Sequence, residues 1–124
     1  MSQVILHITS GEAWKAAQAA GSYEAPSLQS QGFIHLSKPE QVQNTLNRFY
    51  PNATEVLLLH INPAQLQATL KYEAPDHTGA QVEVKSSETE GTFPHLYGAL
   101  NLDAVVDTEN IHRSGESWSW SLGK

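Results

Sequence analysis

A nearly continuous apolar stretch at Glu55–Ile61, with the sequence EVLLLHI, most constrains how this chain can fold. Strands that bury only one face alternate apolar and polar residues, whereas an unbroken apolar run of this length predicts a central strand buried on both faces. The chain has 124 residues, which is the usual size of a single domain. We therefore expect this strand to lie inside the sheet of one domain.

The first half of the chain alternates between strand and helix patterns. Each predicted helix follows a capping box, formed by Thr9 with Glu12 and by Ser37 with Glu40. In chain order, the predicted elements are a strand at residues 4–8, a helix at 10–20, a loop at 22–31, a strand at 32–37 and a helix that starts at Pro39 and ends before Pro51.

The second half is rich in strand patterns. In chain order, we expect strands at Thr69–Glu73, 81–85, 93–100 and 104–111, with a turn at 76–79 and a polar loop or lid at 86–92. Early helices followed by a run of strands predict an α+β domain over residues 1–111. In the tail, residues 112–124, Trp118 and Trp120 alternate with serines, which favours a docked edge strand.

The charge balance restricts the partners of the chain. It has 7 Lys and Arg against 13 Asp and Glu, a formal net charge of −6. Such a surface repels phosphate backbones, so we expect no nucleic-acid partner. Dianionic ligands are also disfavoured unless Lys38, Arg48 or Lys71 line the binding cleft. The absence of cysteine excludes disulfides, thiolate zinc sites and iron–sulfur clusters.

The sequence also bears on localisation. No stretch approaches the roughly 20 apolar residues that span a bilayer, so we expect no membrane partner. Residues 1–7 lack the basic start of a signal peptide, and His7 interrupts their apolar run. The expected localisation is therefore cytoplasmic.

Histidine is the residue type that points most directly to a functional site, with 6 copies in the chain. His7 and His35 each lie near the end of a predicted strand, just before a predicted helix, where ligand sites of α/β sheets collect. His95 lies in a third strand pattern, and period two places Tyr97 on the same face. Taken singly, a strand histidine is more often a hydrogen-bonded part of the fold than a catalyst.

The other histidines have plainer interpretations. His77 and His112 are expected on the solvated surface, and His60 follows a run of leucines and is expected to cap a buried strand. The sequence contains no Walker loop, dinucleotide fingerprint, nucleophile elbow or close-spaced pair of metal ligands. We therefore expect no structural zinc, while a metal site built from the three strand histidines stays open as an alternative.

Four segments of the chain resemble a small bacterial family catalogued as domain of unknown function 952. The similarity extends over about residues 4 to 111, and the ordered combination of segments is specific. The segments are Leu6-His7-Ile8-Thr9, Ala25-Pro26-Ser27-Leu28, Gly32-Phe33-Ile34-His35-Leu36-Ser37 and Phe93-Pro94-His95-Leu96-Tyr97-Gly98.

This family is grouped with the ADP-ribosyltransferase-like fold, a split and mostly antiparallel β-sheet around a cleft that binds NAD in the active members. The resemblance implies that His7 bonds the ribose next to adenine and that His35 packs on nicotinamide. His95 or Tyr97 would lie near a third catalytic position, which is a glutamate in typical transferases. No carboxylate stands in this motif here.

Three neighbouring motif residues, Ser27, Phe33 and Ser37, are expected to line the nucleotide-binding part of the same cleft. Three functions are consistent with these observations. The first is a transferase or phosphoribosyl-processing enzyme that acts on NAD or an ADP-ribose derivative. The second is a non-catalytic module that binds such a ligand. The third is the histidine metal site.

Overall fold

The computed structural model describes residues 4–73, 92–113, 115 and 117–120. Three short 3-10 turns, Pro39–Gln41, Pro63–Gln65 and Leu102–Ala104, connect its helices and strands. In chain order these are β1 (Ile5–Thr9), α1 (Gly11–Ala20), β2 (Ser22–Tyr23), α2 (Pro26–Gln31), β3 (Ile34–His35), α3 (Val42–Phe49), β4 (Glu55–Ile61), β5 (Thr69–Glu73), β6 (Phe93–Tyr97), β7 (Leu100–Asn101) and β8 (Val105–His112).

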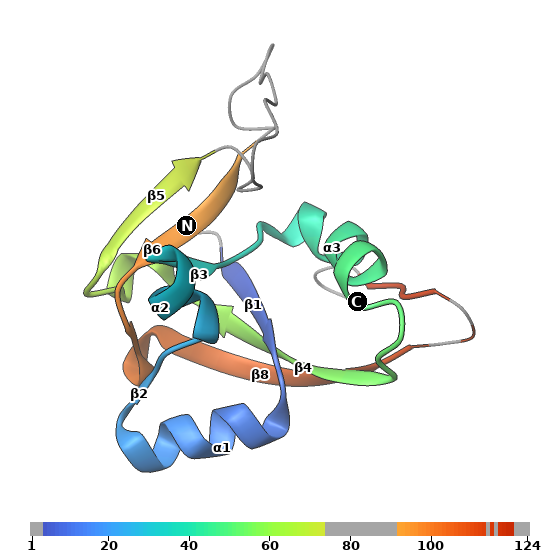
Figure 1. Ribbon diagram of the computed structural model, residues 1–124, viewed down its shortest axis with the longest axis horizontal. Coiled ribbons are helices and arrows are strands. Elements are labelled where there is room, and N and C mark those ends of the chain that lie inside the picture. Colours follow the sequence, from blue (N-terminus) through green and yellow to red (C-terminus); the bar gives the residue numbers. More distant parts are fainter. Residues whose placement is uncertain (1–3, 74–91, 114, 116, 121–124) are drawn as a thin grey trace.

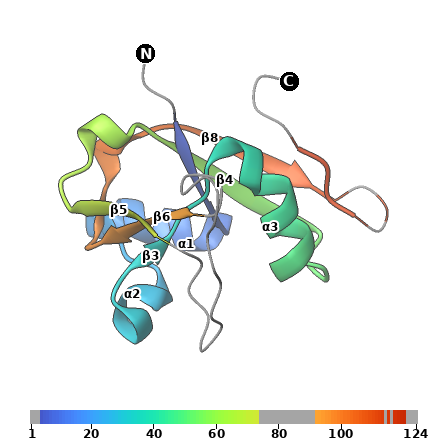
Figure 2. The ribbon, with the colours of Figure 1, turned by 90° about the horizontal axis from the view of Figure 1, so that it is seen from above.

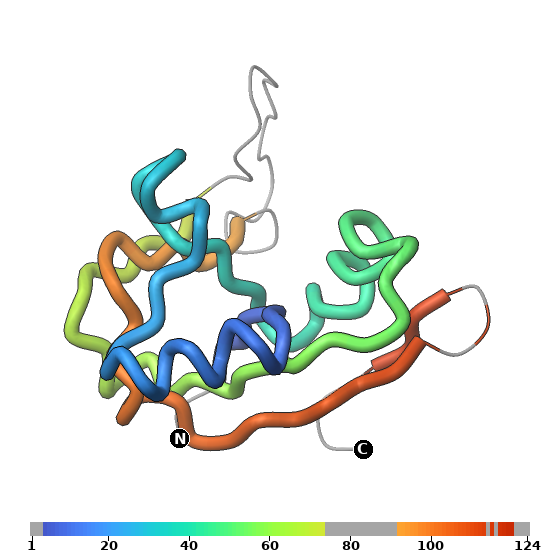
Figure 3. The backbone as a smooth tube through the Cα atoms, turned by 60° about the horizontal axis from the view of Figure 1, so that its bottom comes forward, coloured from blue at the N-terminus to red at the C-terminus, as the bar shows by residue number. Residues whose placement is uncertain are grey.

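The described strands form three small sheets, in the orders β1-β4-β8, β2-β7 and β3-β6-β5. All pairings between these strands are antiparallel. The predicted α+β class with mostly antiparallel strands is confirmed. β4 and β8 run side by side (Figure 3), while the β3-β6-β5 sheet and α3 lie on opposite sides of the molecule (Figures 1 and 2).

The predicted burial of β4 on both faces is confirmed. Leu57 and Leu59 belong to one apolar cluster, which includes Ala17 of α1. Leu58 points the other way, into a second cluster that includes Leu46 of α3. The β4–β8 pair accordingly lies between α1 below and α3 above in Figure 1. This one strand therefore separates two apolar cores.

In the described part of the chain, the β1-β4-β8 and β3-β6-β5 sheets meet at one isolated backbone bridge, between Leu6 and Ser37. The Leu6 amide donates to the Ser37 carbonyl at 2.8 Å, and the Ser37 amide donates to the Leu6 carbonyl at 2.7 Å. Beyond this bridge, β1 continues along β4, whereas β3 pairs with β6. The two sheets thus diverge from a shared pair of backbone hydrogen bonds.

Pro94 shows why a proline is tolerated inside the central strand of the β3-β6-β5 sheet. Its carbonyl accepts a hydrogen bond from the Leu36 amide at 3.0 Å. The second bond of that antiparallel pair would need a Pro94 N–H, which proline lacks. The chain leaves β6 at this point, since Ser37 already pairs with Leu6. Proline therefore lacks its backbone N–H at the position where the partner strand leaves β6, so little pairing is lost.

The prediction of a loop over residues 22–31 is wrong, because this segment contains β2 and α2. Pro26 stands in the first turn of α2, where its missing N–H has no intrahelical role. Gly32 ends the helix with a φ of 93°, the left-handed conformation that glycine adopts without strain. Proline at the start and glycine at the end were the signals for this short helix.

Both helix caps differ from the predicted capping boxes. Ser10, and not Thr9, caps α1 by accepting from the Ala13 amide. Before α3, the chain turns at Lys38, whose amide donates to the Gln41 side chain at 2.9 Å.

No helix in the described part of the chain is long and apolar enough to cross a membrane.

Two predicted strands are shorter in the structure. The expected strand at 32–37 is reduced to Ile34–His35, and that at 93–100 ends at Tyr97. After Gly98, Leu100 joins a different sheet by pairing with Tyr23. The predicted turn at 76–79, the strand at 81–85 and all of the loop at 86–92 except Thr92 lie outside the described residues.

The tail packs against the second apolar cluster through Trp118 and Trp120, and residues 118–120 are not in a strand. Trp118 is buried in the cluster that contains Leu58 and Leu46. Its indole N–H donates to the Tyr50 carbonyl at 2.9 Å, and its backbone N–H donates to Asn47 Oδ1 at 2.7 Å. These contacts hold residue 118 against the end of α3.

Gly98 provides a test of the backbone geometry next to β6. Its φ is 155°, and a Cβ atom there would lie 2.7 Å from the Ala68 Cβ. We expect Gly98→Ala to lower the free energy of unfolding by about 1–3 kcal/mol, because both the backbone and the contact are strained. Urea unfolding measures the change. Gly11→Ala is the control, since no heavy atom lies within 4 Å of its Cβ position; equal stability of the two variants would contradict this prediction.

Candidate functional site

Four of the predicted site residues lie together on the outer face of the β3-β6-β5 sheet. They are Phe33, His35, His95 and Tyr97, and we call them the His–aromatic cluster. His35 and His95 are direct partners in the β3–β6 pairing. The intervening residues, Ile34 and Leu96, point the other way into the apolar core. Period-two alternation on two paired strands therefore separates core from cluster.

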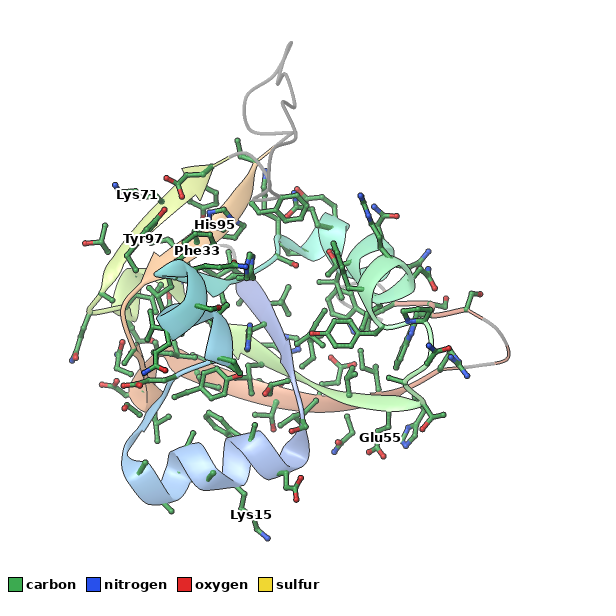
Figure 4. The ribbon with its side chains drawn as sticks, in the orientation of Figure 1. Lys15, Phe33, Glu55, Lys71, His95 and Tyr97 are labelled. Carbon is green, nitrogen blue, oxygen red and sulfur yellow. The ribbon has the colours of Figure 1, made fainter. Side chains whose placement is uncertain are left out.

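The rings of the cluster are in mutual contact. Phe33 stacks on His95 with a centroid distance of 4.2 Å and an interplanar angle of 19°. His35 meets these two rings edge-on, at centroid distances of 4.9 and 5.5 Å. Tyr97 is tilted against Phe33 at 5.2 Å. Figure 4 shows Phe33, His95 and Tyr97 close together beside β5 and β6. The imidazole of His95 is thus enclosed by aromatic surface.

Glu73 adds a carboxylate to this cluster from β5. Its Oε1 accepts from His95 Nδ1 at 2.9 Å and from the Tyr97 hydroxyl at 2.5 Å. The hydrogen bond from Tyr97, followed by that from His95, holds the pKa of Glu73 below its ordinary value. Sequence reasoning missed this residue. The signal was the alternation in Thr69–Glu73, which places Lys71 and Glu73 on one face, but only the β5–β6 register identifies that face.

The hydrogen bond to Glu73 determines how His95 presents its ring. An ionised carboxylate only accepts, so Nδ1 of His95 carries the proton. In the neutral ring, Nε2 is then a lone-pair acceptor. This atom is buried and has no hydrogen-bond partner among the described residues. The His95 side chain as a whole is 2% exposed.

Lys71 is the cation that accompanies the cluster. It pairs with His95 in the β5–β6 register, and its Nζ lies 5.1 Å from the centroid of the Tyr97 ring. Of the three basic residues considered for an anionic ligand, this one is placed at the cluster. Arg48 instead stacks on Phe49 at the end of α3. Lys38 lies at the turn before that helix.

His35 has an exposed ring at the edge of the cluster. Its Nε2 donates to the side-chain oxygen of Gln31 at 2.6 Å, so α2 holds the imidazole in place. Ser27, also from α2, donates its hydroxyl to the Phe33 carbonyl at 2.8 Å. Ser37 is buried and forms the bridge to Leu6. Both serines therefore support the backbone of the cluster. Ser27 donates a hydrogen bond to the carbonyl of Phe33, and Ser37 anchors the chain just after His35 to β1.

His7 lies behind the cluster, and both of its ring nitrogens are engaged. Nδ1 donates to the His35 backbone carbonyl at 2.7 Å, and Nε2 accepts from the Tyr23 hydroxyl at 2.9 Å. That hydroxyl is also 3.0 Å from Thr9 Oγ1. Burial lowers the pKa of His7 to about 4, against the opposing effect of the bond to His35. His7 is therefore neutral at pH 7 and ties β1 to β3.

The described residues contain no group of three or more His, Cys, Asp or Glu side chains that could hold a metal ion. His7 illustrates the reason, since its two nitrogens face a carbonyl and a hydroxyl. The three strand histidines do not converge on one point. The metal alternative therefore receives no support from this geometry.

These features define an α+β protein of small antiparallel sheets, with an imidazole–carboxylate pair and an aromatic cluster beside the point where two sheets diverge. A family model described as "Protein of unknown function (DUF952)" matches residues 8–108. The chain belongs to this family, as the sequence segments predicted. A search of curated proteins finds no match.

Solved structures of one bacterial protein are similar to this chain. The crystal structure of protein CC0527 from Caulobacter crescentus has a TM-score of 0.74 and 29% identity, covering 93% of this chain and 91% of that one. The crystal structure of a double mutant of CC0527 has a TM-score of 0.74 and 28% identity, with the same coverage of both chains. The solution NMR structure of CC0527 has a TM-score of 0.64 and 26% identity, covering 92% of this chain and 89% of that one. The likeness thus extends over nearly the full length of both chains.

The pKa of His7 leads to a prediction about stability and pH. The unfolded chain takes up a proton near the ordinary value of 6.5, whereas the folded chain does so only at about 4. Stability is therefore lost as the pH falls from 6.5 toward 4, by roughly 3 kcal/mol in total. Urea unfolding at pH values between 7.5 and 4.5 measures this loss.

The matched comparison is His7→Gln against His112→Gln. His112 is exposed, with 70% of its side chain accessible. We expect His7→Gln to be less stable at pH 7.5 but to lose less stability than the wild type on acidification. His112→Gln should retain the wild-type slope. A wild-type slope in His7→Gln would show that His7 is not the titrating group.

Proposed function

We propose that this protein binds a nucleotide of the NAD or ADP-ribose class at the His–aromatic cluster. The observation that carries the proposal is the composition of one sheet face. Stacked rings, a cation, a carboxylate and an imidazole acceptor with no described partner lie side by side there. A nucleotide has complementary parts, namely a flat ring, an anionic pyrophosphate and ribose hydroxyls. Each has a candidate contact here.

The ring and the phosphates have the clearest candidate contacts. Tyr97 and His35 are exposed while they contact the buried ring of Phe33, so a planar heterocycle can extend the existing stack. Lys71 offers a cation on the same face. The net charge of −6 disfavours anions elsewhere on the surface, so a local lysine is needed for this ligand.

Two further observations support the same ligand class. The β1-β4-β8 and β3-β6-β5 sheets diverge from the Leu6–Ser37 bridge, as expected for a split sheet of the ADP-ribosyltransferase-like fold. The motif around His95 lacks a carboxylate, yet Glu73 supplies one from the adjacent strand. A carboxylate can stabilise positive charge that develops on ribose during transfer. A non-catalytic binding module is the second candidate, and the absence of nicotinamide release from a bound NAD would favour it.

Lys71→Gln tests the proposed contact with the phosphates. Lys71 is exposed, so we expect the melting temperature to stay close to that of the wild type. Affinity for ADP-ribose should fall roughly fivefold, the equivalent of about 1 kcal/mol for a solvent-exposed charge pair. Adenosine, which has no phosphate, should bind the variant and the wild type equally. Ligand-detected NMR titrations measure all four affinities.

The control is Lys15→Gln, on α1 and away from the cluster (Figure 4). It removes the same charge from the whole molecule, so a purely global electrostatic effect would lower both affinities for ADP-ribose equally. Equal losses in the two variants would exclude a contact with Lys71. If neither NAD nor ADP-ribose bound the wild type at millimolar concentration, the proposed function would be wrong.

A further inference from the structure

Three histidine–carboxylate pairs occur in the described part of the chain, and one differs in how the imidazole is held. In His60–Glu109 and His112–Glu55, Nε2 at the tip of the ring faces the carboxylate, at 3.0 and 3.6 Å. In His95–Glu73, the carboxylate takes Nδ1 at the base of the ring. The buried tip of His95 therefore has no hydrogen-bond partner among the described residues, whereas the other two tips face a carboxylate.

The available atom has a defined chemical character. Because Nδ1 donates to Glu73, Nε2 of the neutral ring carries a lone pair and no proton. Glu73 is itself held by the Tyr97 hydroxyl, which fixes the carboxylate and through it the ring. Phe33 stacks on the imidazole and restricts its rotation. The result is an acceptor that is oriented in advance and lacks a described partner.

A buried acceptor without a partner costs free energy, which a ligand can recover by donating a hydrogen bond. An anionic phosphate is repelled by the lone pair. A metal ion would need further ligands, and the described residues offer no such group. An amino group has two N–H donors that both need an acceptor. A hydroxyl has one O–H donor, for which a single acceptor is enough. The complementary group is therefore a hydroxyl.

We propose that Nε2 of His95 accepts a hydrogen bond from a ribose hydroxyl of the ligand, and that Glu73 is the positioning residue that, by accepting from Nδ1, leaves the lone pair of the neutral ring on Nε2. This inference rests on the proposed function and adds the group that the site recognises. Nε2 is shielded, so the hydroxyl reaches it when a covering side chain moves. Among the rings packed on His95, that of His35 is exposed to solvent and lies 5.5 Å from it, so it marks the solvent side of the cluster.

The first experiment compares NAD with NAD analogues that lack the 2′ or 3′ hydroxyl of either ribose, using isothermal titration of the full chain. We expect one analogue to bind the wild type about tenfold more weakly, as for the loss of one hydrogen bond to a buried acceptor. His95→Gln should bind NAD and that analogue with equal affinity. If NAD binds and every hydroxyl proves dispensable, the inference is wrong while the proposed function stands. No binding of NAD or ADP-ribose overturns both.

The second experiment reads the tautomer directly, by two-bond proton–nitrogen NMR of the imidazole side chains. In the wild type, His95 should show a protonated Nδ1 and an unprotonated Nε2, and NAD should shift the Nε2 resonance. Glu73→Gln should move part of the population to the other tautomer and weaken NAD binding severalfold. This variant also covers the case in which His95→Gln does not fold, since the Glu73 side chain is 37% exposed.

Glu55→Gln is the matched control, because it neutralises the carboxylate of an exposed histidine pair far from the cluster (Figure 4). It should leave both the His95 tautomer and the affinity for NAD unchanged. A protonated Nε2 in the unliganded wild type would overturn the inference. The inference is also wrong if methylating an amino group of the ligand lowers its affinity while removing any of the hydroxyls leaves the affinity unchanged.

Discussion

The pair of backbone hydrogen bonds between Leu6 and Ser37 connects the apolar core to the candidate site. On one side of this bridge, β1 belongs to a sheet that is anchored by the double burial of β4. On the other side, β3 leads directly into the strand pair that carries His35 and His95. The position of the cluster is thus set by a core whose residues do not themselves take part in it.

His7 reinforces this junction with a side chain. Where β1 and β3 separate, the His35 carbonyl would lack a backbone partner from β1, and His7 Nδ1 supplies the hydrogen bond instead. Tyr23 then satisfies the remaining ring nitrogen. The low pKa of His7 follows from this buried position. The same histidine that the family resemblance assigns to ribose binding therefore has a structural role that the geometry explains fully, and its two nitrogens would have to leave their partners before contacting a ligand.

The sequence alone predicted the elements whose signals are local. The apolar run of β4 indicated double burial, and alternation brought His35, His95 and Tyr97 to one face. Prediction from the sequence failed where the deciding contact joins residues that are far apart in the chain. Glu73 is 22 residues from His95, and nothing in its own strand shows that a histidine lies opposite. The α2 helix was missed for a different reason. It has only six residues, too few to show a helical periodicity, so the polar composition and Pro26 favoured the prediction of a loop.

The contrast between His7 and His95 shows why burial alone does not identify a functional histidine. Both are buried in strands, and both have Nδ1 committed to an oxygen of a neighbouring strand. In His7 the second nitrogen meets a hydroxyl, so the hydrogen-bonding capacity of the ring is used up by the fold. In His95 the second nitrogen meets no described partner, and the first donates to the carboxylate of Glu73. A fold gains nothing from leaving a buried acceptor unpaired. The proposed ligand hydroxyl would recover this cost at His95, whereas His7 has no hydrogen-bonding capacity left for a ligand.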